Sequence, residues 1–415
     1  MNTNQAAIEL VNDTFERTLN NILACFLASG NMQNVPLIDD ETVPSCLPNT
    51  LPKLAIAYSG GLDSSVLLHI AHKFSIKYGF ALYAFHIHHG ISHNADDWLA
   101  HCEAQCKQLN VPFDAQKVTI AKSAKTGIEE AARISRYAAL GTLCRKNGVS
   151  ILLTAHHQDD QAETILLQLL RGSGVAGLSG MDIQNAAPDL LGDASVQMAR
   201  PLLTASRAEL AVFAAENAIH FVEDESNSDL RYARNALRHT VMPALAQSFP
   251  GFQERLARTA QHAQSAQRLL IALAEQDLQE CQDGDCLDIR QLRQLNPDRT
   301  YNLLRYWFGS RGVRMPSTAW LSEMLTQLLE AKEDAQLCVT HADCHIRRYQ
   351  NRIFMTPKLD EAGLSVVPAT FRWMGERQIA FPAYSGVIYF DASEQGFDMD
   401  WLLNEPLTIR LRRGG

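Results

Sequence analysis

The sequence lacks the features of a membrane or exported protein. It has no run of about 18 apolar residues, which a membrane-spanning helix requires. Its first nine residues contain no lysine or arginine ahead of an apolar core, as a secretory signal would. We therefore expect a cytoplasmic protein with no membrane contact. Its 415 residues, 46% hydrophobic and 20% charged, predict two or three folded domains.

Cysteine pairs at metal-binding spacing are also missing. The nine cysteines are scattered, and none has the two-residue gap to another that is typical of zinc ribbons and many iron–sulfur sites. The nearest pairs are Cys102 with Cys106, Cys281 with Cys286, and Cys338 with Cys344. We therefore expect reduced thiols and neither kind of metal centre.

The chain has no excess of basic residues. Its formal net charge is −9, whereas nucleic-acid-binding proteins usually present a basic surface. Any RNA contact must therefore come from a local patch. Arg231, Arg234 and Arg238 fall on one face of a predicted helix and could bind phosphates. A solvated charged face is the alternative interpretation of this stripe.

One glycine-rich turn has the arrangement of a phosphate-binding loop. Residues 59–64 read Ser-Gly-Gly-Leu-Asp-Ser, and they lie between the apolar run 54–58 and a segment with helical spacing. Backbone N–H groups at such a strand-to-helix turn are unpaired, and glycine lets the backbone approach phosphate oxygens. No Gly-Lys-Ser/Thr follows, so the turn is not a kinase-type P-loop. An ordinary glycine turn is the alternative.

The residue types in this turn indicate separate roles. Ser59 and Ser64 can donate hydroxyl hydrogen bonds to a phosphate. Asp63 has the wrong charge to bind phosphate directly, and it is instead a candidate ligand for a bridging Mg²⁺. The candidate nucleotide-binding residues of the turn are Ser59, Gly60, Gly61, Leu62, Asp63 and Ser64.

Strand and helix patterns alternate from Leu51 to about Arg200. The strand-like runs are 53–58, 80–88 and 149–155, and the helical patterns are 64–78, 94–109, 127–147 and 160–171. This alternation predicts an α/β fold with a doubly wound parallel sheet. Ligands bind such sheets beyond the carboxyl ends of the strands. The glycine turn and the segments 86–90 and 156–160 all follow strand ends, so we expect them to meet in one crevice.

The rest of the chain divides by its patterns. Helical patterns cover 207–217 and 231–245 and dominate 253–331, and strand-like pieces lie at 345–355, 377–390 and 406–412. The predicted organisation is 1–50, an N-terminal extension and linker; 51–245, the catalytic α/β domain; 246–356, a mainly helical domain; 357–368, a linker; and 369–415, the start of an α+β C-terminal domain that we expect to be incomplete.

A second polar cluster occupies residues 156–164. A helix beginning near Asp159 would place His156, Asp160 and Glu163 along one face or its approach. Two acids and an imidazole at a strand end suit metal binding or proton abstraction. The alternative is an N-capped helix whose acids favour the helix dipole.

Two further segments are open to both functional and structural interpretations. Arg133 could reach a phosphate or an amino-acid substrate, or it could form an ordinary i,i+4 pair with Glu129. The glycine-rich segment 171–181 could face a substrate, or it could be a long connection between elements.

The order of these motifs resembles that of the tRNA(Ile)-lysidine synthetases, members of the PP-loop ATP pyrophosphatase superfamily. The resemblance is strong over residues 51–250 and weaker beyond them. His88 stands where members often carry aspartate. The matching segments are 59–64, 86–90, 153–164, 171–181, 224–227 and 234–238.

The resemblance implies an adenine nucleotide alpha hydrolase-like fold and a two-step reaction with ATP and Mg²⁺. The oxygen at position 2 of the wobble cytosine in the CAU anticodon of tRNA(Ile) is adenylated, and pyrophosphate leaves. The ε-amine of L-lysine then attacks the activated carbon, and AMP leaves. The implied partners are this tRNA and L-lysine. The oligomeric state is open, with a homodimer among the options.

The resemblance also implies roles for single residues. Asp63 would hold Mg²⁺, and Asp160 and Glu163 would accept the proton of the lysine amine or hold its ammonium until transfer. Arg234 would stabilise the α-phosphate or the reacting base. His156 and Arg133 would orient the lysine or the adenylate. The expected catalytic residues are Asp63, Asp160, Glu163 and Arg234.

Two arginine groups in the later domains are candidate tRNA patches, because the RNA stem is recognised by shape and phosphate contacts. They are Arg347, Arg348 and Arg352, and Arg410, Arg412 and Arg413.

Three other functions fit a PP-loop less well. A tRNA 2-thiolase usually needs cysteine pairs, and none has that spacing. An amidotransferase or NAD synthetase needs an ammonia source, and no glutaminase-like N-terminal cysteine is present. A non-catalytic RNA-binding module would not need Asp63, Asp160 and Glu163.

Overall fold

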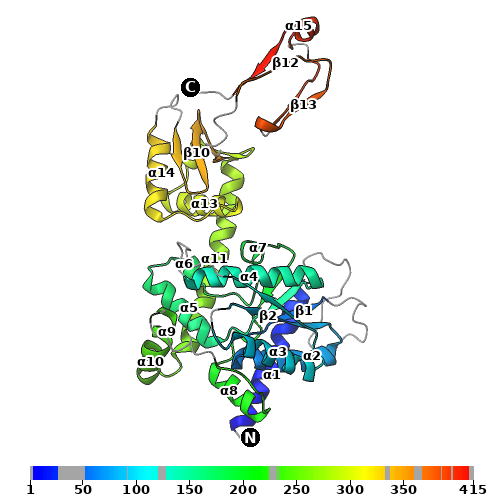
Figure 1. Cartoon of the computed structure of the whole chain (residues 1–415). Helices are drawn as coiled ribbons and strands as arrows, with labels where there is room; N and C mark the ends of the chain where they lie inside the picture. Colours follow the sequence, from blue (N-terminus) through cyan, green and yellow to red (C-terminus); the bar gives the residue numbers. More distant parts are fainter. Residues whose placement is uncertain are drawn as a thin grey trace. The chain divides into compact units, whose positions relative to one another are not determined.

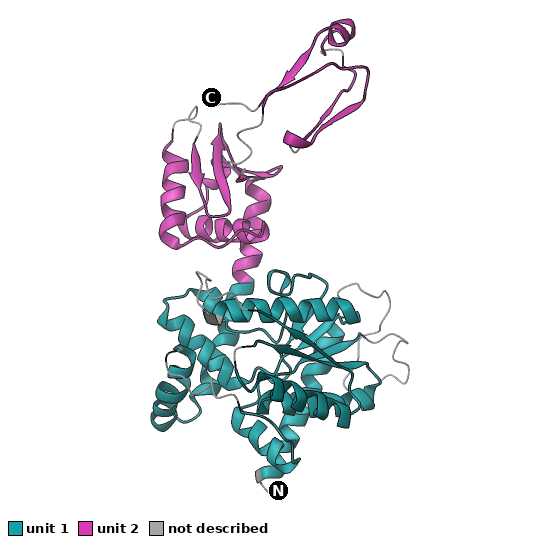
Figure 2. Cartoon of the chain, in the orientation of Figure 1, with its two compact units in different colours: residues 1–268 teal, residues 269–415 magenta. Residues whose placement is uncertain are grey.

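The computed structural model of the chain describes residues 3–26, 52–90, 92–119, 128–223, 231, 233–331, 337–358, 367–384, 386–393 and 396–410. The chain divides into two compact units, Met1–Arg268 and Leu269–Gly415, which Figure 2 shows in different colours. Helix α11 (Phe252–Cys281) contributes residues to both units. The domain limits drawn from the sequence stay predictions.

Unit 1 is built on one sheet. Its strands are β1 (Leu54–Ala57), β2 (Leu82–His88), β3 (Phe113–Lys117), β4 (Ile151–Leu153), β5 (Gln184–Ala186) and β6 (Gln197–Ala199). The strand order is β3-β2-β1-β4-β6-β5, and all neighbours are parallel except β5, which is antiparallel to β6. The predicted α/β fold with a parallel sheet is confirmed.

The helices of unit 1 follow the predicted alternation. They are α1 (Thr3–Phe26), α2 (Leu62–Tyr78), α3 (Ala95–Gln108), α4 (Ile128–Asn147), α5 (Gln158–Leu170), α6 (Val175–Leu178), α7 (Pro188–Leu191), α8 (Arg207–Glu216), α9 (Ala233–Ala236), the π-helical turn η3 (Leu237–Val241) and α10 (Met242–Ser248). Each of the four helices expected between 64 and 171 is present, with ends that differ by up to two residues.

The sheet is covered on both faces, which explains the unbroken apolar sequence of β1. Leu54 and Ile56 pack in a core formed with α1, α2, α3 and α8, whereas Ala55 packs in a second core with α4 and α7. Successive strand residues point to opposite faces, so a strand buried on both sides has no polar alternation. Figure 1 shows α4 and α7 on one side of the sheet and α2 and α3 on the other.

Helix α1 belongs to unit 1 and packs in its core. Val11, Phe15, Leu19 and Ile22 recur at helical spacing and are almost fully buried. Phe15 packs against Phe74 of α2 with ring centroids 5.3 Å apart. Residues 27–50 of the expected extension and linker lie outside the described residues.

Unit 2 contains a five-stranded antiparallel sheet next to helices. Its strands are β7 (Gln282–Asp283), β8 (Cys286–Asp288), β9 (Cys338–Thr340), β10 (Cys344–Tyr349) and β11 (Arg352–Pro357), in the order β7-β8-β11-β10-β9. The helices are α12 (Ile289–Leu292), α13 (Pro297–Ser310) and α14 (Thr318–Glu330). Trp307, Phe308 and Met324 lie in their shared core. The short β7–β8 hairpin interrupts the segment expected to be helical.

Two small antiparallel sheets of two strands each follow in unit 2. Strand β12 (Ala369–Phe371) pairs with β15 (Leu407–Ile409), and β13 (Gln378–Phe381) pairs with β14 (Gly386–Tyr389). Helix α15 (Met399–Asn404) lies between β14 and β15 in the chain. Among the described residues, no helix is both long and apolar enough to cross a membrane.

The prediction of one arginine patch is wrong in part, because Arg348 is not exposed. Arg348 is only 3% exposed, and its guanidinium donates to the carbonyl oxygens of Leu328 and Ala331, each at 2.7 Å. These carbonyls belong to the end of α14, where helix acceptors lack partners. Arg348 therefore holds the helix end and is not available to a phosphate. Arg347 and Arg410 are exposed, and Arg412 and Arg413 lie outside the described residues.

Candidate active site

The glycine turn leaves the start of α2 open. Gly61 is the N-cap residue of α2, and no side chain caps it. The Ser64 hydroxyl donates to the Gly61 carbonyl oxygen at 3.0 Å and lies 3.0 Å from the Ser59 hydroxyl. The amide groups of the first helical turn therefore remain available to an anion, which the helix dipole also attracts.

Gly60 is required by packing as well as by any ligand. Its φ is +85°, in the left-handed region, and a Cβ there would lie 2.8 Å from Cys102 Sγ and 3.2 Å from Val222 Cγ2. Its carbonyl oxygen accepts from the Val222 amide at 2.9 Å. A side chain at position 60 would therefore push the turn away from α3.

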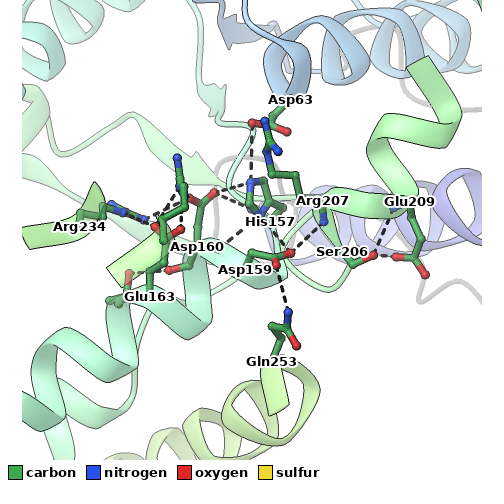
Figure 3. Close-up of polar contacts among 12 residues, drawn as sticks. Asp63, His157, Asp159, Asp160, Glu163, Ser206, Arg207, Glu209, Arg234 and Gln253 are labelled. Atoms are coloured by element: carbon green, nitrogen blue, oxygen red, sulfur yellow. Dashed lines mark hydrogen bonds and ion pairs between the residues drawn. The ribbon is translucent and has the colours of Figure 1, made fainter. Parts of the chain in front are cut away.

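His157 connects the turn to the second polar cluster. It follows β4, the neighbour of β1, and is the N-cap residue of α5. Its Nε2 lies 3.7 Å from Asp63 Oδ2 and 3.3 Å from Asp160 Oδ2, as Figure 3 shows. The two aspartates that sequence analysis expected in one crevice thus flank a single imidazole, which is 1% exposed.

The local sequence explains how α5 begins. The His157 ring accepts from the Asp160 amide at 3.3 Å, and the Asp160 carboxylate accepts from the His157 amide at 3.1 Å. This reciprocal arrangement is a capping box with histidine in the usual place of serine or threonine. It fixes Asp160 in the cleft while its second oxygen faces the arginines described below.

The charges around His157 shift both partners. Burial alone would lower the pKa of His157, but the hydrogen bond to Asp63 and the carboxylates of Asp160, Asp63 and Asp159 outweigh it and raise that pKa. Burial would raise the pKa of Asp160, but His157 and Arg234 outweigh it and lower that pKa. Asp160 is therefore ionised at neutral pH, which suits a group that holds a cation.

Two arginines bind the acids of α5. Arg234 Nε donates to Glu163 Oε2 at 2.7 Å, and Arg238 Nε donates to Glu163 Oε1 at 2.6 Å. Both arginines also donate from Nη2 to Asp160 Oδ1 at 3.2 Å. They come from α9 and the π-helical turn η3, a rare element that often occurs at functional sites.

Glu163 depends on these arginines. Its side chain is 1% exposed, whereas those of Arg234 and Arg238 are 29% and 30% exposed. A buried carboxylate needs such partners, and removing one partner of a buried pair costs about 3–5 kcal/mol. Both arginines are partly solvated and both pair with Glu163. We therefore expect the removal of either one alone to cost less stability than this.

His156 and Arg133 lie near the same end of the sheet. The His156 Nδ1 is 2.9 Å from the Thr154 hydroxyl, and burial, opposed by Asp160, lowers the pKa of His156 to about 3. His156 is therefore neutral in the folded protein. The Arg133 guanidinium lies over the Tyr137 ring, 4.9 Å from its centroid, and its charge contributes to the lowered pKa of His156.

The structure brings Asp63, Asp160, Glu163 and Arg234 into one connected cluster, and sequence reasoning missed two of its members. His157 was passed over beside His156, and Arg238 was noted only as part of a charged stripe. The signals were present: His157 stands three residues before Asp160, and Arg238 follows Arg234 by one helical turn. Residues 224–229 of the expected acidic segment lie outside the described residues.

The family comparisons match both units. The PP-loop domain model matches residues 38–245, and the TilS substrate binding domain model matches residues 287–354.

Among the described residues, no group of three or more His, Cys, Asp or Glu side chains could hold a metal ion.

Curated relatives share one name, tRNA(Ile)-lysidine synthase. The Burkholderia pseudomallei protein is 49% identical over 311 residues, covering 74% of this chain and 62% of that protein. The Coxiella burnetii protein is 36% identical over 360 residues, covering 87% and 78%. The Alkalilimnicola ehrlichii protein is 38% identical over 387 residues, covering 92% and 84%. The chain thus spans less than two thirds of the length of the Burkholderia protein.

Proposed function

The chain belongs to the tRNA(Ile)-lysidine synthase family, and from that premise we propose that it joins L-lysine to position 2 of the wobble cytidine in the CAU anticodon of tRNA(Ile). The reaction would consume ATP and release pyrophosphate and AMP. The observation that carries this proposal is the buried His157, which links Asp63 of the glycine turn to Asp160 of the carboxylate cluster. A nucleotide on the turn would have its α-phosphate close to the residues that handle the base and the amine.

In the first step, the cytosine O2 attacks the α-phosphorus, and the bond to pyrophosphate breaks with its electrons leaving on pyrophosphate. A carbonyl oxygen is a weak nucleophile, so positioning and charge neutralisation must supply most of the acceleration. The open N-terminus of α2 and the hydroxyls of Ser59 and Ser64 support binding of the phosphates. Arg234 would stabilise the α-phosphate or the reacting base.

The Asp63 carboxylate is a suitable ligand for Mg²⁺. Asp63 Oδ1 is buried without a hydrogen-bond partner among the described residues. Magnesium in nucleotide sites is usually held by one or two carboxylates together with phosphates and water, so a full set of protein ligands is not needed. When bound, the ion would offset negative charge on the phosphates.

In the second step, the lysine ε-amine forms the C2–N bond, and the C2–O bond breaks with its electrons leaving on AMP. The free ammonium has a pKa of about 10.4, so it must lose a proton before it can attack. Asp160, which its lowered pKa keeps ionised, and Glu163 would hold the ammonium until transfer or accept its proton. Neutral His156 and Arg133 would orient the lysine or the adenylate.

The tRNA would also contact unit 2. The match of residues 287–354 to a substrate binding domain supports this, and the exposed Arg347 is a candidate phosphate contact. That the protein acts in the cytoplasm and that it forms a homodimer remain predictions.

The direct test supplies the protein with ATP, Mg²⁺, radiolabelled lysine and a tRNA transcript that carries the CAU anticodon. We expect the label to enter the RNA only when ATP is present. A transcript with a UAU anticodon is the matched control and should stay unlabelled. No label in the CAU transcript, or RNA modification only when a sulfur donor is added, would reject the proposal and favour thiolation in the second case.

A further inference from the structure

The helix that carries Arg234 and Arg238 contains one widened turn. It runs through α9, the π-helical turn η3 and α10, and the Met242 amide donates to the Leu237 carbonyl oxygen, five residues earlier in the chain. In an α-helix the amide would bond to the carbonyl four residues earlier. A π turn inside an α-helix thus holds one extra residue, and such turns are frequent at functional sites.

The burial pattern follows the widened turn. Leu237 and Met242 are five residues apart, and they are 5% and 7% exposed. Val241 has the α-helical spacing of four residues from Leu237, yet it is 40% exposed. In an uninterrupted α-helix, residues four apart share a face, so Val241 would be the residue that packs inward. The π turn therefore moves the inward position from residue 241 to residue 242.

The residues after the turn explain why it forms. Met242 packs with Ala162 of α5 and Phe252 of α11 in a small core. Pro243 has no amide hydrogen, and in an α-helix its ring would clash with the carbonyl group of His239. An α-helical path through this turn would therefore carry a steric cost, and the packing of Met242 fixes the alternative.

The two sides of the turn are both bound to α5, as the position of α9 and α10 beside α5 in Figure 1 shows. Met242 packs on Ala162, whereas Arg238 bonds to the next residue of α5, Glu163. In an α-helix, residues four apart lie side by side, so Arg238 would stand directly beside Met242. The wider turn rotates Arg238 about the helix axis relative to Met242. The extra residue thus sets the direction from which the guanidinium reaches Glu163.

Arg238 fixes the orientation of two acids. Its Nε donates to Glu163 Oε1 at 2.6 Å, and its Nη2 donates to Glu163 Oε2 at 3.0 Å and to Asp160 Oδ1 at 3.2 Å. Arg234 bonds to Oε2 of Glu163. A carboxylate bound at both oxygens by one planar guanidinium is held in one orientation. Arg238 therefore determines how the Glu163 carboxylate is turned.

We propose that the π turn η3 is a positioning element of the active site, an inference that rests on the proposed function. The turn directs Arg238 onto both oxygens of Glu163 and thereby orients Glu163 and Asp160 for the lysine step. Arg238 is a positioning residue, because it acts through these two acids. Arg234 precedes the widened turn, so its place does not depend on the extra residue.

The first test removes the extra residue. Thr240 is exposed, and its deletion brings Met242 to the α-helical spacing of four residues from Leu237. We expect lysine transfer to fall about tenfold or more, because the acids are then misplaced. Pyrophosphate release with tRNA in the absence of lysine should not change. Thr240→Ala is the matched control, because it removes the side chain but keeps the turn, and it should behave as the wild type.

The second test asks whether the turn acts through Arg238. Arg238→Gln alone should lower lysine transfer about tenfold. Deletion of Thr240 in the Arg238→Gln background should cause no further loss, because changes that act through one contact are not additive. In the Arg234→Lys background the deletion should still cause its full loss. Losses that multiply in both backgrounds would overturn the link between the turn and Arg238.

A variant of unchanged length covers the case in which the deletion does not fold. Val241→Met combined with Met242→Val places the larger side chain at the α-helical spacing from Leu237. We expect the same selective loss of lysine transfer at a melting temperature that shows a folded protein. A folded variant with wild-type lysine transfer would overturn the proposal.

The failure of this inference differs from that of the proposed function. A wild-type protein that labels no RNA would reject the proposed function. Normal labelling by the wild type, with undiminished lysine transfer after deletion of Thr240, would reject the role of the π turn alone.

Discussion

Arg348 of unit 2 and the pair Arg234 and Arg238 of unit 1 bind different kinds of acceptor. In unit 2, Arg348 donates to backbone carbonyls of Leu328 and Ala331, which lie 20 and 17 residues away in the chain. In unit 1, Arg234 and Arg238 donate to the carboxylates of Asp160 and Glu163, more than 70 residues away. Arg348 is 3% exposed, whereas the side chains of the unit 1 arginines are about 30% exposed.

This difference indicates what each arrangement does. The carbonyls at the end of α14 are fixed by the helix and accept from the Arg348 guanidinium, so Arg348 completes a local structure. The carboxylates of unit 1 can exchange one cation for another, because a guanidinium and an ammonium bind the same oxygens. The arginines of the cleft can likewise move to a phosphate. Arg234 and Arg238 are thus placed as parts of an exchangeable site, whereas Arg348 is placed as part of the scaffold.

The largest expected effect is that of Asp160→Asn. The amide keeps the shape and can still accept from the His157 backbone, but it cannot hold an ammonium or take its proton. We expect lysine transfer to fall about 1,000-fold, the scale of a lost acid–base group. The measurement is radiolabelled lysine in RNA, with circular dichroism to monitor the fold. Near-normal turnover would remove Asp160 from the reaction.

Arg234→Lys tests whether the forked guanidinium matters beyond its charge. Lysine keeps the positive charge but cannot bind two acceptors in a plane. We expect pyrophosphate release with tRNA to fall about 100-fold, the scale of a lost donor to developing charge. Arg258→Lys on α11 is the matched control, because that arginine pairs with Glu254 at the surface. If both variants behave alike, Arg234 belongs to the scaffold.

Arg348→Met should have the opposite profile. Methionine fills similar space but leaves the carbonyls of Leu328 and Ala331 without this donor, and a lost hydrogen bond to a charged group costs about 2 kcal/mol. We expect the free energy of unfolding to fall by that amount in urea. The reaction rate per folded molecule should not change. A large loss of lysidine formation with unchanged stability would make Arg348 part of a tRNA contact after all.

The sequence predicted the α/β fold because its central strands and helices carry strong patterns. Strand β1 is continuously apolar, and the helices beside it have long amphipathic sequences. The other strands were missed because β5 (Gln-Asn-Ala) and β6 (Gln-Met-Ala) lack the apolar run that β4 has at the same length, and β3 is the polar edge strand Phe-Asp-Ala-Gln-Lys. Pairing in the sheet stabilises them, and no local pattern indicates that.

The site was predictable where its residues lie in consecutive positions. The turn at Gly60 and Gly61 and the start of α5 follow from local spacing. The bonds from Arg234 and Arg238 to Glu163 join segments more than 70 residues apart, so periodicity does not predict them. Arg348 is the opposite case. It lies between the exposed residues Arg347 and Tyr349 on β10, and only the tertiary structure shows that it binds carbonyl groups at the end of α14.

The last predicted effect concerns the pH dependence of stability at two neighbouring histidines. The pKa of His156 is lowered and that of His157 is raised. Burial lowers the pKa of His156 to about 3, so the unfolded chain binds its proton more readily. Its stability contribution is full above the unfolded pKa of about 6.5 and is lost as the pH falls. We expect the wild type to lose about 2 kcal/mol more than His156→Gln between pH 7 and pH 5.

His157 should show the reverse dependence. Its pKa is raised by Asp63 and Asp160 against the effect of burial, so its contribution is full below about pH 6.5 and is lost as the pH rises through the folded pKa. The stability gap between the wild type and His157→Gln should therefore be wider at pH 5 than at pH 8. Urea unfolding at both pH values measures the gap. The same slope for both histidine variants would mean that His157 is not held between ionised carboxylates, and the link between Asp63 and Asp160 would lose its electrostatic basis.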